Sequence, residues 1–414
     1  MGRVYLIPVA SPLHDPQAVN EVLNQYVEVL KKHVDEVFKI VTSEEDLNNV
    51  SVTSEDLALV AVLTGGSEAL TVRVSDLAGY TALLPHKTMN SLPASLEAYA
   101  TLTASGKPSS LILEWPPNGK VLNFIKSWKV VSKLSSLKLG LIGEPSPWLT
   151  YSSGTEVENG LKELFSNMEF VRVDLKELYD EVGRIPNSEV SSLVENVFKG
   201  AERSFVAREE LVKPLKIYLA LKNIIRNYGL DAITIRCFDV IKELKTTACL
   251  SLALLNSEGF VAGCEGDLPA VVTMYLASKL SDSPAFMGNL AWVEGNEVLV
   301  AHCTVALKLT RAYELKTHFE SGLGVGIAGF IPEGSKVTMV RLDPISRTLR
   351  FAVGTVASGV PLSAHHCRTQ VRIRLNADLK NLIEYSIGNH YVLVFEDISE
   401  ELKYVAEVLG LAVD

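Results

Sequence analysis

Short apolar runs alternate with amphipathic segments over the first two thirds of the chain. The runs are rich in β-branched residues and bounded by turn residues, which predicts buried strands, and the segments between them have helical period. The predicted strands cover residues 4–10, 38–40, 57–63, 82–84, 111–113, 138–142 and 169–173, and the predicted helices cover 16–33, 91–104, 188–209 and 212–228. Strands that alternate with helices in this way predict parallel sheets covered by helices.

The pattern changes after residue 284 to alternation of period two, as in VLVAHCTVALKL and HYVLVFED, with turns between the runs. This pattern predicts a β-rich region, which a helix over residues 399–409 completes. We therefore expect an α/β protein with two doubly wound, Rossmann-like domains, residues 1–134 and 135–284, followed by a β-rich C-terminal domain, residues 285–414.

The segment from Asp231 to Leu280 contains two predicted strands, residues 232–237 and 260–264, separated by an apolar segment of helical length, residues 240–256. Strand, helix and strand of this size form a right-handed βαβ unit with parallel strands. The unit places three acidic residues together at the carboxyl ends of its strands, where open α/β sheets bind ligands. These residues are Asp239, Glu265 and Asp267.

Carboxylates gathered at one strand edge repel one another unless a cation neutralises them, and their oxygens suit Mg²⁺ or Mn²⁺. Each residue alone also has a simpler interpretation. Asp267 precedes Leu268 and Pro269 and could cap a helix, and Glu265 could be a solvated loop residue. The group, rather than either residue singly, favours a metal site.

Composition narrows the class of protein. The net charge is −10, with no basic tract interleaved with aromatic residues, which argues against nucleic acid as a partner. The longest uncharged apolar runs fall short of the roughly 20 residues of a membrane span. The N-terminus leads directly into a strand-like run, so we expect a cytoplasmic protein rather than a secreted one.

The five cysteines are an odd number without a CxxC pair and lie in apolar contexts. We therefore interpret them as small buried hydrophobic residues in a reducing compartment rather than as a disulfide or zinc framework. A glycine cluster at residues 322–326 is followed by no helical pattern, which predicts a turn or a close approach of backbone rather than a phosphate loop.

Three histidines, His302, His318 and His390, lie in distinctive settings of the β-rich region. A lone histidine is usually a structural group. His390 differs because the turn at Gly388 and Asn389 presents its imidazole at the head of a strand, which suits a metal ligand.

At these positions the chain resembles the L-fucose isomerase and L-arabinose isomerase superfamily, especially its short fucose-isomerase-like members. The resemblance covers nearly the whole chain, and GCEGD and GNHY are its most specific elements. The matching segments are TGG near residue 64, NSLPASLEA, GLIGEPSPWL, RCFD, GCEGD, HCTV, THFESGLGVGIAG, CRTQVRI and GNHYVLVFED.

The resemblance implies an Mn²⁺-dependent aldose–ketose isomerase, with Mg²⁺ or Co²⁺ as alternative ions, that forms a homo-oligomer such as a trimer or hexamer. It assigns the first acidic ligand to Asp239, with Glu243 one helical turn later as a competitor. Asp239 stands where the family commonly has a glutamate, which shortens the reach of the acid. The other implied residues are Glu265, Asp267, His390 and His302 as metal ligands, Glu265 with Asp239 or Glu243 as the catalytic pair, and His318 and Asn389 as sugar contacts.

The chemistry of isomerisation needs a base, an acid and a charge that stabilises a cis-enediolate, and carboxylates beside a metal ion supply these. Two alternatives stay open. One is a non-catalytic sugar-binding or regulatory paralogue with the same fold. The other is an epimerase or an isomerase of a modified sugar, such as a sulfo-sugar, that uses the same site.

Overall fold

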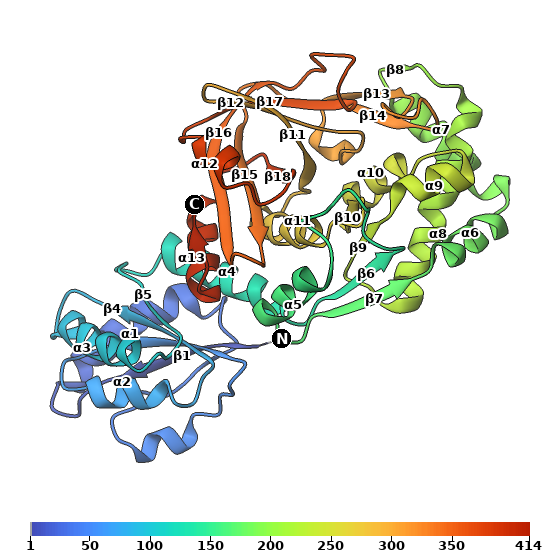
Figure 1. Cartoon of the computed structure of the whole chain (residues 1–414). Coiled ribbons are helices and arrows are strands. Elements are labelled where there is room, and N and C mark those ends of the chain that lie inside the picture. The colour runs from blue at the N-terminus through green and yellow to red at the C-terminus, as the bar shows by residue number, and fades with distance from the viewer. Residues whose placement is uncertain (1) are drawn as a thin grey trace. The chain divides into compact units, whose positions relative to one another are not determined.

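The computed structural model describes residues 2–414, and these form four β-sheets (Figure 1). The chain divides into two units by its internal contacts. Unit 1 consists of residues up to Lys133 together with Glu400–Gly410, and unit 2 of Leu134–Ser399 together with Leu411–Asp414. The division into three domains stays a prediction.

Unit 1 contains a parallel sheet of strand order β2-β1-β3-β4-β5. Strands β1, β3 and β4 are buried along their whole length because helices cover both faces of the sheet. Helices α1, α4 and α13 pack on one face, and α2 and α3 on the other. The elements are β1 (Val4–Val9), α1 (Pro16–Leu30), β2 (Glu36–Val37), η1 (Glu45–Asn49), β3 (Leu57–Val62), α2 (Glu68–Val74), β4 (Tyr80–Pro85), α3 (Ser91–Ala104), β5 (Ser109–Leu111), α4 (Gly119–Leu134) and α13 (Ser399–Leu409).

Unit 2 contains a second parallel sheet, of strand order β10-β9-β6-β7. The predicted parallel pairing of the strands on either side of residues 240–256 is therefore confirmed. The elements of this part are β6 (Lys138–Ile142), α5 (Thr155–Leu164), β7 (Glu169–Val173), α6 (Leu175–Arg184), α7 (Asn187–Gly200), β8 (Arg203–Ser204), η2 (Arg208–Leu211), α8 (Val212–Tyr228), β9 (Ala232–Ile235), α9 (Cys237–Leu244), α10 (Cys249–Ser257), β10 (Val261–Cys264) and α11 (Leu268–Ser281).

Several details differ from the sequence prediction. Helix α1 ends at Leu30, and strands β2 and β5 begin two residues earlier than predicted. The single helix expected over residues 240–256 is two helices, because Lys245 adopts a left-handed conformation, φ 54°, and ends α9 there. Strand β9 also ends at Ile235 rather than at Cys237, so Asp239 lies in the first turn of α9. The helix expected over residues 188–209 ends at Gly200.

The C-terminal region is β-rich, as predicted. Six antiparallel strands close into a barrel in the order β15-β18-β11-β12-β17-β16, with β15 and β16 also paired (Figure 1). The strands β14-β13-β8 form a further small sheet, and β19 pairs with β16. The elements are β11 (Phe286–Glu294), β12 (Glu297–His302), η3 (Leu307–Leu309), β13 (Ala312–Lys316), β14 (Gly326–Phe330), β15 (Lys336–Asp343), β16 (Thr348–Ser358), β17 (Thr369–Leu375), α12 (Lys380–Glu384), β18 (His390–Val394) and β19 (Ala412–Val413).

The glycine cluster before β14 is a close approach of backbone. Gly324 has φ 57°, and a Cβ atom on it would lie 2.6 Å from the backbone nitrogen of Thr247. Only glycine fits this position without displacing the neighbouring segment. Among the described residues, no helix is both long and apolar enough to cross a membrane.

Candidate metal centre

Three side chains from separate elements of unit 2 converge at the carboxyl end of β10. Glu265 follows β10, His302 ends β12 and His390 begins β18. Glu265 Oε1 lies 3.5 Å from His302 Nε2 and 3.6 Å from His390 Nε2. All three residues are buried, and one ligand atom from each lies within 4.8 Å of the others.

Three of the four ring nitrogens of His302 and His390 lack hydrogen-bond partners. Both ring nitrogens of His302 and Nε2 of His390 are buried and make no hydrogen bond. A buried polar atom without a partner costs about 1–3 kcal/mol. Two imidazoles and a carboxylate are a donor set that divalent transition metals accept. The residues therefore fit a metal ion.

Asp267 orients His390 through the ring nitrogen that faces away from Glu265. Its Oδ2 accepts a 2.9 Å hydrogen bond from His390 Nδ1, and its Oδ1 accepts one of 2.8 Å from the Ala270 backbone nitrogen. Asp267 thus caps α11, as one of its two sequence interpretations predicts. Metal-ligating histidines commonly donate their other nitrogen to a carboxylate in this way. The assignment of Asp267 as a direct ligand stays a prediction.

Buried charges at the centre shift one another's pKa values. Burial alone would raise the pKa of Glu265, but the neighbouring rings of His302 and His390 hold it well below its usual range. Burial alone would lower the pKa of His390, but its bond to Asp267 and the nearby Glu265 carboxylate raise it to about 9. Without a metal ion, the centre is therefore a carboxylate beside a protonated imidazole at neutral pH.

The backbone at Glu265 is held in an unusual conformation. Glu265 has φ 64° and Gly266 has φ 72°. A Cβ atom on Gly266 would lie 2.7 Å from the Cα atom of Pro145, so only glycine fits there. Ser146 N donates to the Glu265 carbonyl at 2.9 Å, and Trp148 Nε1 donates to Glu265 Oε2 at 2.6 Å. Left-handed non-glycine residues are strained and cluster at functional sites.

A cavity of about 20 Å³ adjoins the centre. This volume holds about one water-sized group, which suits an ion rather than a sugar. His318 lines the cavity, and burial, with the charges of His302 and Arg368, lowers its pKa to about 4. Asn389, the other predicted sugar contact, donates to Asn289 Oδ1 at 2.8 Å, and Asn289 lines the cavity.

Sequence reasoning did not assign Trp148, Asn289 or Glu320 to the site. Glu320 also lines the cavity, and burial together with the negative charge of Glu265 raises its pKa. Trp148 lies in the loop after β6, and Glu320 lies two residues after His318. Both belong to segments that carried the family resemblance.

Asp239 and Glu243 are not brought to this cluster. The Asp239 carboxylate forms ion pairs with Arg236 and, at 3.0 Å, with Lys242. It lines a separate cavity, of about 420 Å³, which Glu144 also lines. Glu243 is exposed on α9. Their roles as ligand or catalytic acid stay predictions.

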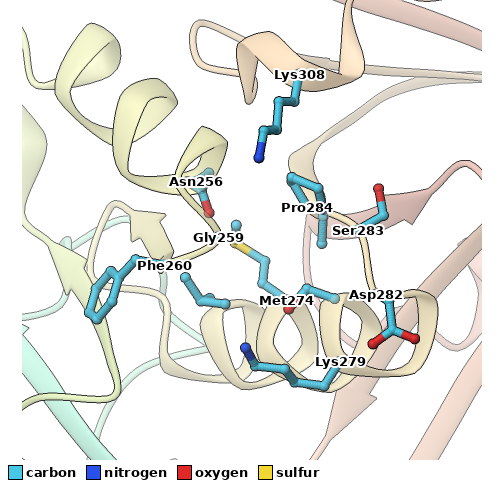
Figure 2. Close-up of a pocket in the computed structure, with 12 residues that line it drawn as sticks. Asn256, Gly259, Phe260, Met274, Lys279, Asp282, Ser283, Pro284 and Lys308 are labelled. Atoms are coloured by element: carbon cyan, nitrogen blue, oxygen red, sulfur yellow. The ribbon is translucent and has the colours of Figure 1, made fainter.

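Another cavity, of about 230 Å³, lies at the opposite, amino end of β10 (Figure 2). Its described lining offers one carboxylate, Asp282, two lysines, Lys279 and Lys308, and no histidine. It therefore lacks the donor set found around Glu265.

Comparison with known proteins finds relatives that are named sulfoquinovose isomerase. The chain is 25% identical to the sulfoquinovose isomerase of Alkalicoccus urumqiensis over 354 residues. This aligned region covers 78% of this chain and 76% of that protein. It is 26% identical over 311 residues to that of Priestia aryabhattai, covering 70% and 67%. It is 23% identical over 314 residues to that of Clostridium sp. (strain MSTE9), covering 70% and 67%.

No model of a known protein family matches the chain. The relatives are sugar isomerases by name, so the comparisons support the sugar-isomerase part of the resemblance. The particular superfamily, the identity of the metal ion and the oligomeric state stay predictions.

Proposed function

We propose that this chain is a metal-dependent isomerase that interconverts an aldose and a ketose. The observation that carries the proposal is the convergence of Glu265, His302 and His390, with three histidine nitrogens that are buried and make no hydrogen bond. These three residues would hold the ion, with Asp267 orienting His390. Mn²⁺ is our first choice of ion, and Mg²⁺ and Co²⁺ are alternatives.

Isomerisation moves a proton from C2 to C1 of the sugar through an enediolate, and the enolic hydrogen moves between the two oxygens. A divalent ion held at this centre would stabilise the negative charge that develops on those oxygens. Glu265 is held ionised, so it is available as a metal ligand, and we assign it as the acceptor of the C2 proton. Glu320 keeps its proton to a higher pH than an ordinary glutamate, as an acid partner requires.

The cavity geometry agrees with this division of roles. Glu265 is buried, while Glu320 lines the same cavity with a side chain that is open to solvent apart from its partly buried carboxyl group. The sugar would therefore bind at the open side of the cavity, where it reaches both carboxylates. His318 has a lowered pKa and would contact the sugar as a neutral imidazole.

The names of the relatives favour a sulfonated aldose as the substrate, which is the modified-sugar alternative of the sequence analysis. The candidate substrates are therefore sulfoquinovose and unmodified aldoses such as fucose and arabinose.

The test is a screen for ketose formation with metal-stripped protein, with and without added Mn²⁺, in D₂O. An isomerase gives a ketose with deuterium at C1, because the moved proton exchanges with solvent on the base. An epimerase instead gives an aldose with deuterium at C2. Absence of both product and Mn²⁺ binding would contradict the proposal and favour a non-catalytic binding paralogue.

A further inference from the structure

All five cysteines of the chain line the cavity beside the candidate metal centre. They come from positions that span 130 residues, which are Cys237, Cys249, Cys264, Cys303 and Cys367. Four are buried, as the sequence predicts. A role as small hydrophobic side chains accounts for their burial but not for their convergence on one cavity.

Two of the cysteines form a close pair. Cys237 begins α9 and Cys264 ends β10, and the register of β9 and β10 places Cys264 beside Ile235, two residues before Cys237. Their Sγ atoms lie 2.9 Å apart. A disulfide bond is about 2.05 Å long, so its formation needs roughly 1 Å of movement.

Cys303 and Cys367 form the second pair. Strands β12 and β17 are antiparallel with His302 beside Thr369, so Cys303, just after β12, and Cys367, two residues before β17, lie at the same end of this strand pair, and both line the cavity. Cys367 is half-buried, so this pair is reachable from solvent, whereas Cys303 is buried. The fifth cysteine, Cys249, begins α10 and also lines the cavity, but no sulfur contact is seen for it among the described residues, and we leave it outside the two pairs.

We propose that Cys237 with Cys264, and Cys303 with Cys367, are two peroxide-oxidisable dithiols that form disulfide bonds in the wall of the site. In each pair the two sulfurs lose two electrons and two protons as the S–S bond forms. One hydrogen peroxide accepts them, its O–O bond breaks, and two water molecules leave. This pairing does not depend on the isomerase function.

The pairs also adjoin the metal ligands. Cys264 precedes Glu265, and Cys303 follows His302, in the sequence. Closing either bond shifts a cysteine that is covalently adjacent to a metal ligand, and the ligand must keep its position. We therefore expect oxidation to weaken Mn²⁺ binding by about tenfold, a change typical of disturbed support around metal ligands. This consequence, unlike the pairing, rests on the proposed metal centre.

The experiment treats the reduced, metal-free, full-length protein with hydrogen peroxide and maps its peptides by mass. We expect the five thiols to fall to one, Cys249, with both predicted bridges present and both reversed by dithiothreitol. Cys249→Ser, the matched control, should keep both bridges. Cys237→Ser should lose only the first bridge, and Cys367→Ser only the second.

Several results would overturn the proposal. One is that the folded protein keeps all five thiols while an unfolded sample oxidises. Another is that peroxide gives sulfinic acids without cross-links. The third is that the bridges involve Cys249. The wild-type map needs no variant, so a variant that fails to fold does not affect it. Calorimetry with Mn²⁺ on both forms then tests the coupling, and bridges that leave the affinity unchanged would contradict that part alone.

Discussion

The ends of β9 and β10 are neighbours at one edge of a parallel sheet, and acidic residues follow both strands. After β10, Glu265 meets two histidines of the barrel whose nitrogens have no other partner. After β9, Asp239 meets Arg236 and Lys242 of its own helix. Glu265 and Asp239 thus both lie near the sheet edge. They differ in the side chains that the rest of the fold places beside them.

The largest effect should come from Glu265→Gln, which keeps the shape of the side chain but removes its charge. We expect turnover to fall by about 10³-fold or more, because both a base and a metal ligand are lost. Steady-state kinetics with the substrate found in the screen measures the loss. Glu163→Gln, at an exposed position of α5 with no assigned role in the site, is the matched control. A Glu265→Gln protein that unfolds would instead support a structural role for this residue.

The next largest effect should follow His302→Ala. Since His302 makes no hydrogen bond, its removal breaks no internal contact of that kind, yet the centre loses one of three ligands. We expect Mn²⁺ affinity to fall by more than about 100-fold, measured by calorimetry on stripped protein. His33→Ala, at an exposed position of unit 1, is the control. Unchanged affinity would show that the histidine ring is not a ligand.

Much of this arrangement could be predicted from the sequence. Helix 91–104 and strands 138–142 and 169–173 have the predicted bounds, because apolar period and turn residues determine such elements locally. Glu265 and Asp267 were placed at the sheet edge by the parallel βαβ rule, and His390 was placed at the head of a strand by its glycine turn.

The position of Asp239 could not be predicted in the same way. The rule for strand ends applies to the last residue of β9, and the sequence does not show whether this is Ile235 or Cys237. An end at Ile235 puts Asp239 three residues after Arg236 on a helix, where the two side chains pair. The contacts of Trp148 and Glu320 come from loops, whose paths depend on tertiary packing rather than on a local pattern.

The pH dependence of stability tests whether the carboxylates of Asp267 and Glu265 hold His390 protonated. The pKa of His390 is about 9 in the folded metal-free protein and roughly 6.5 in an unfolded chain. Because folding raises it, the stabilisation is fully present below pH 6.5 and is lost as pH rises through 9. Its size is on the order of 3 kcal/mol.

Urea unfolding of the metal-free protein from pH 6 to 9 measures this contribution as the difference between wild type and His390→Gln. Taking this difference cancels the contributions of other groups that titrate in this range. Cys303 is one such group, because its interaction with Cys367 lowers its pKa. A difference that stays constant with pH would show that His390 is not held protonated by Asp267 and Glu265.

Asp267→Asn separates capping from support of the metal centre. Asparagine also caps helices well, so the bond to Ala270 should persist. The charge that orients His390 is lost, and we expect Mn²⁺ affinity to fall by about 10- to 100-fold. Calorimetry measures the affinity. Unfolding curves of the metal-free protein report any loss of stability from the weakened ion pair with Arg341, whose Nη1 lies 3.9 Å from Asp267 Oδ2. Unchanged affinity would leave Asp267 as a helix cap alone.

The smallest effect should follow Asp239→Asn, which addresses the β9 side of the comparison directly. Asp239 pairs with two cations and lines a different cavity, so its charge should matter little at Glu265. We expect Mn²⁺ affinity and turnover to stay within about twofold, and stability to change by about 0–1 kcal/mol, the range of partly exposed ion pairs. A loss of tenfold or more in affinity would instead support the ligand role that the family resemblance assigns to Asp239. In that case α9 would have to rearrange when metal binds, because its first turn now directs this carboxylate to Arg236.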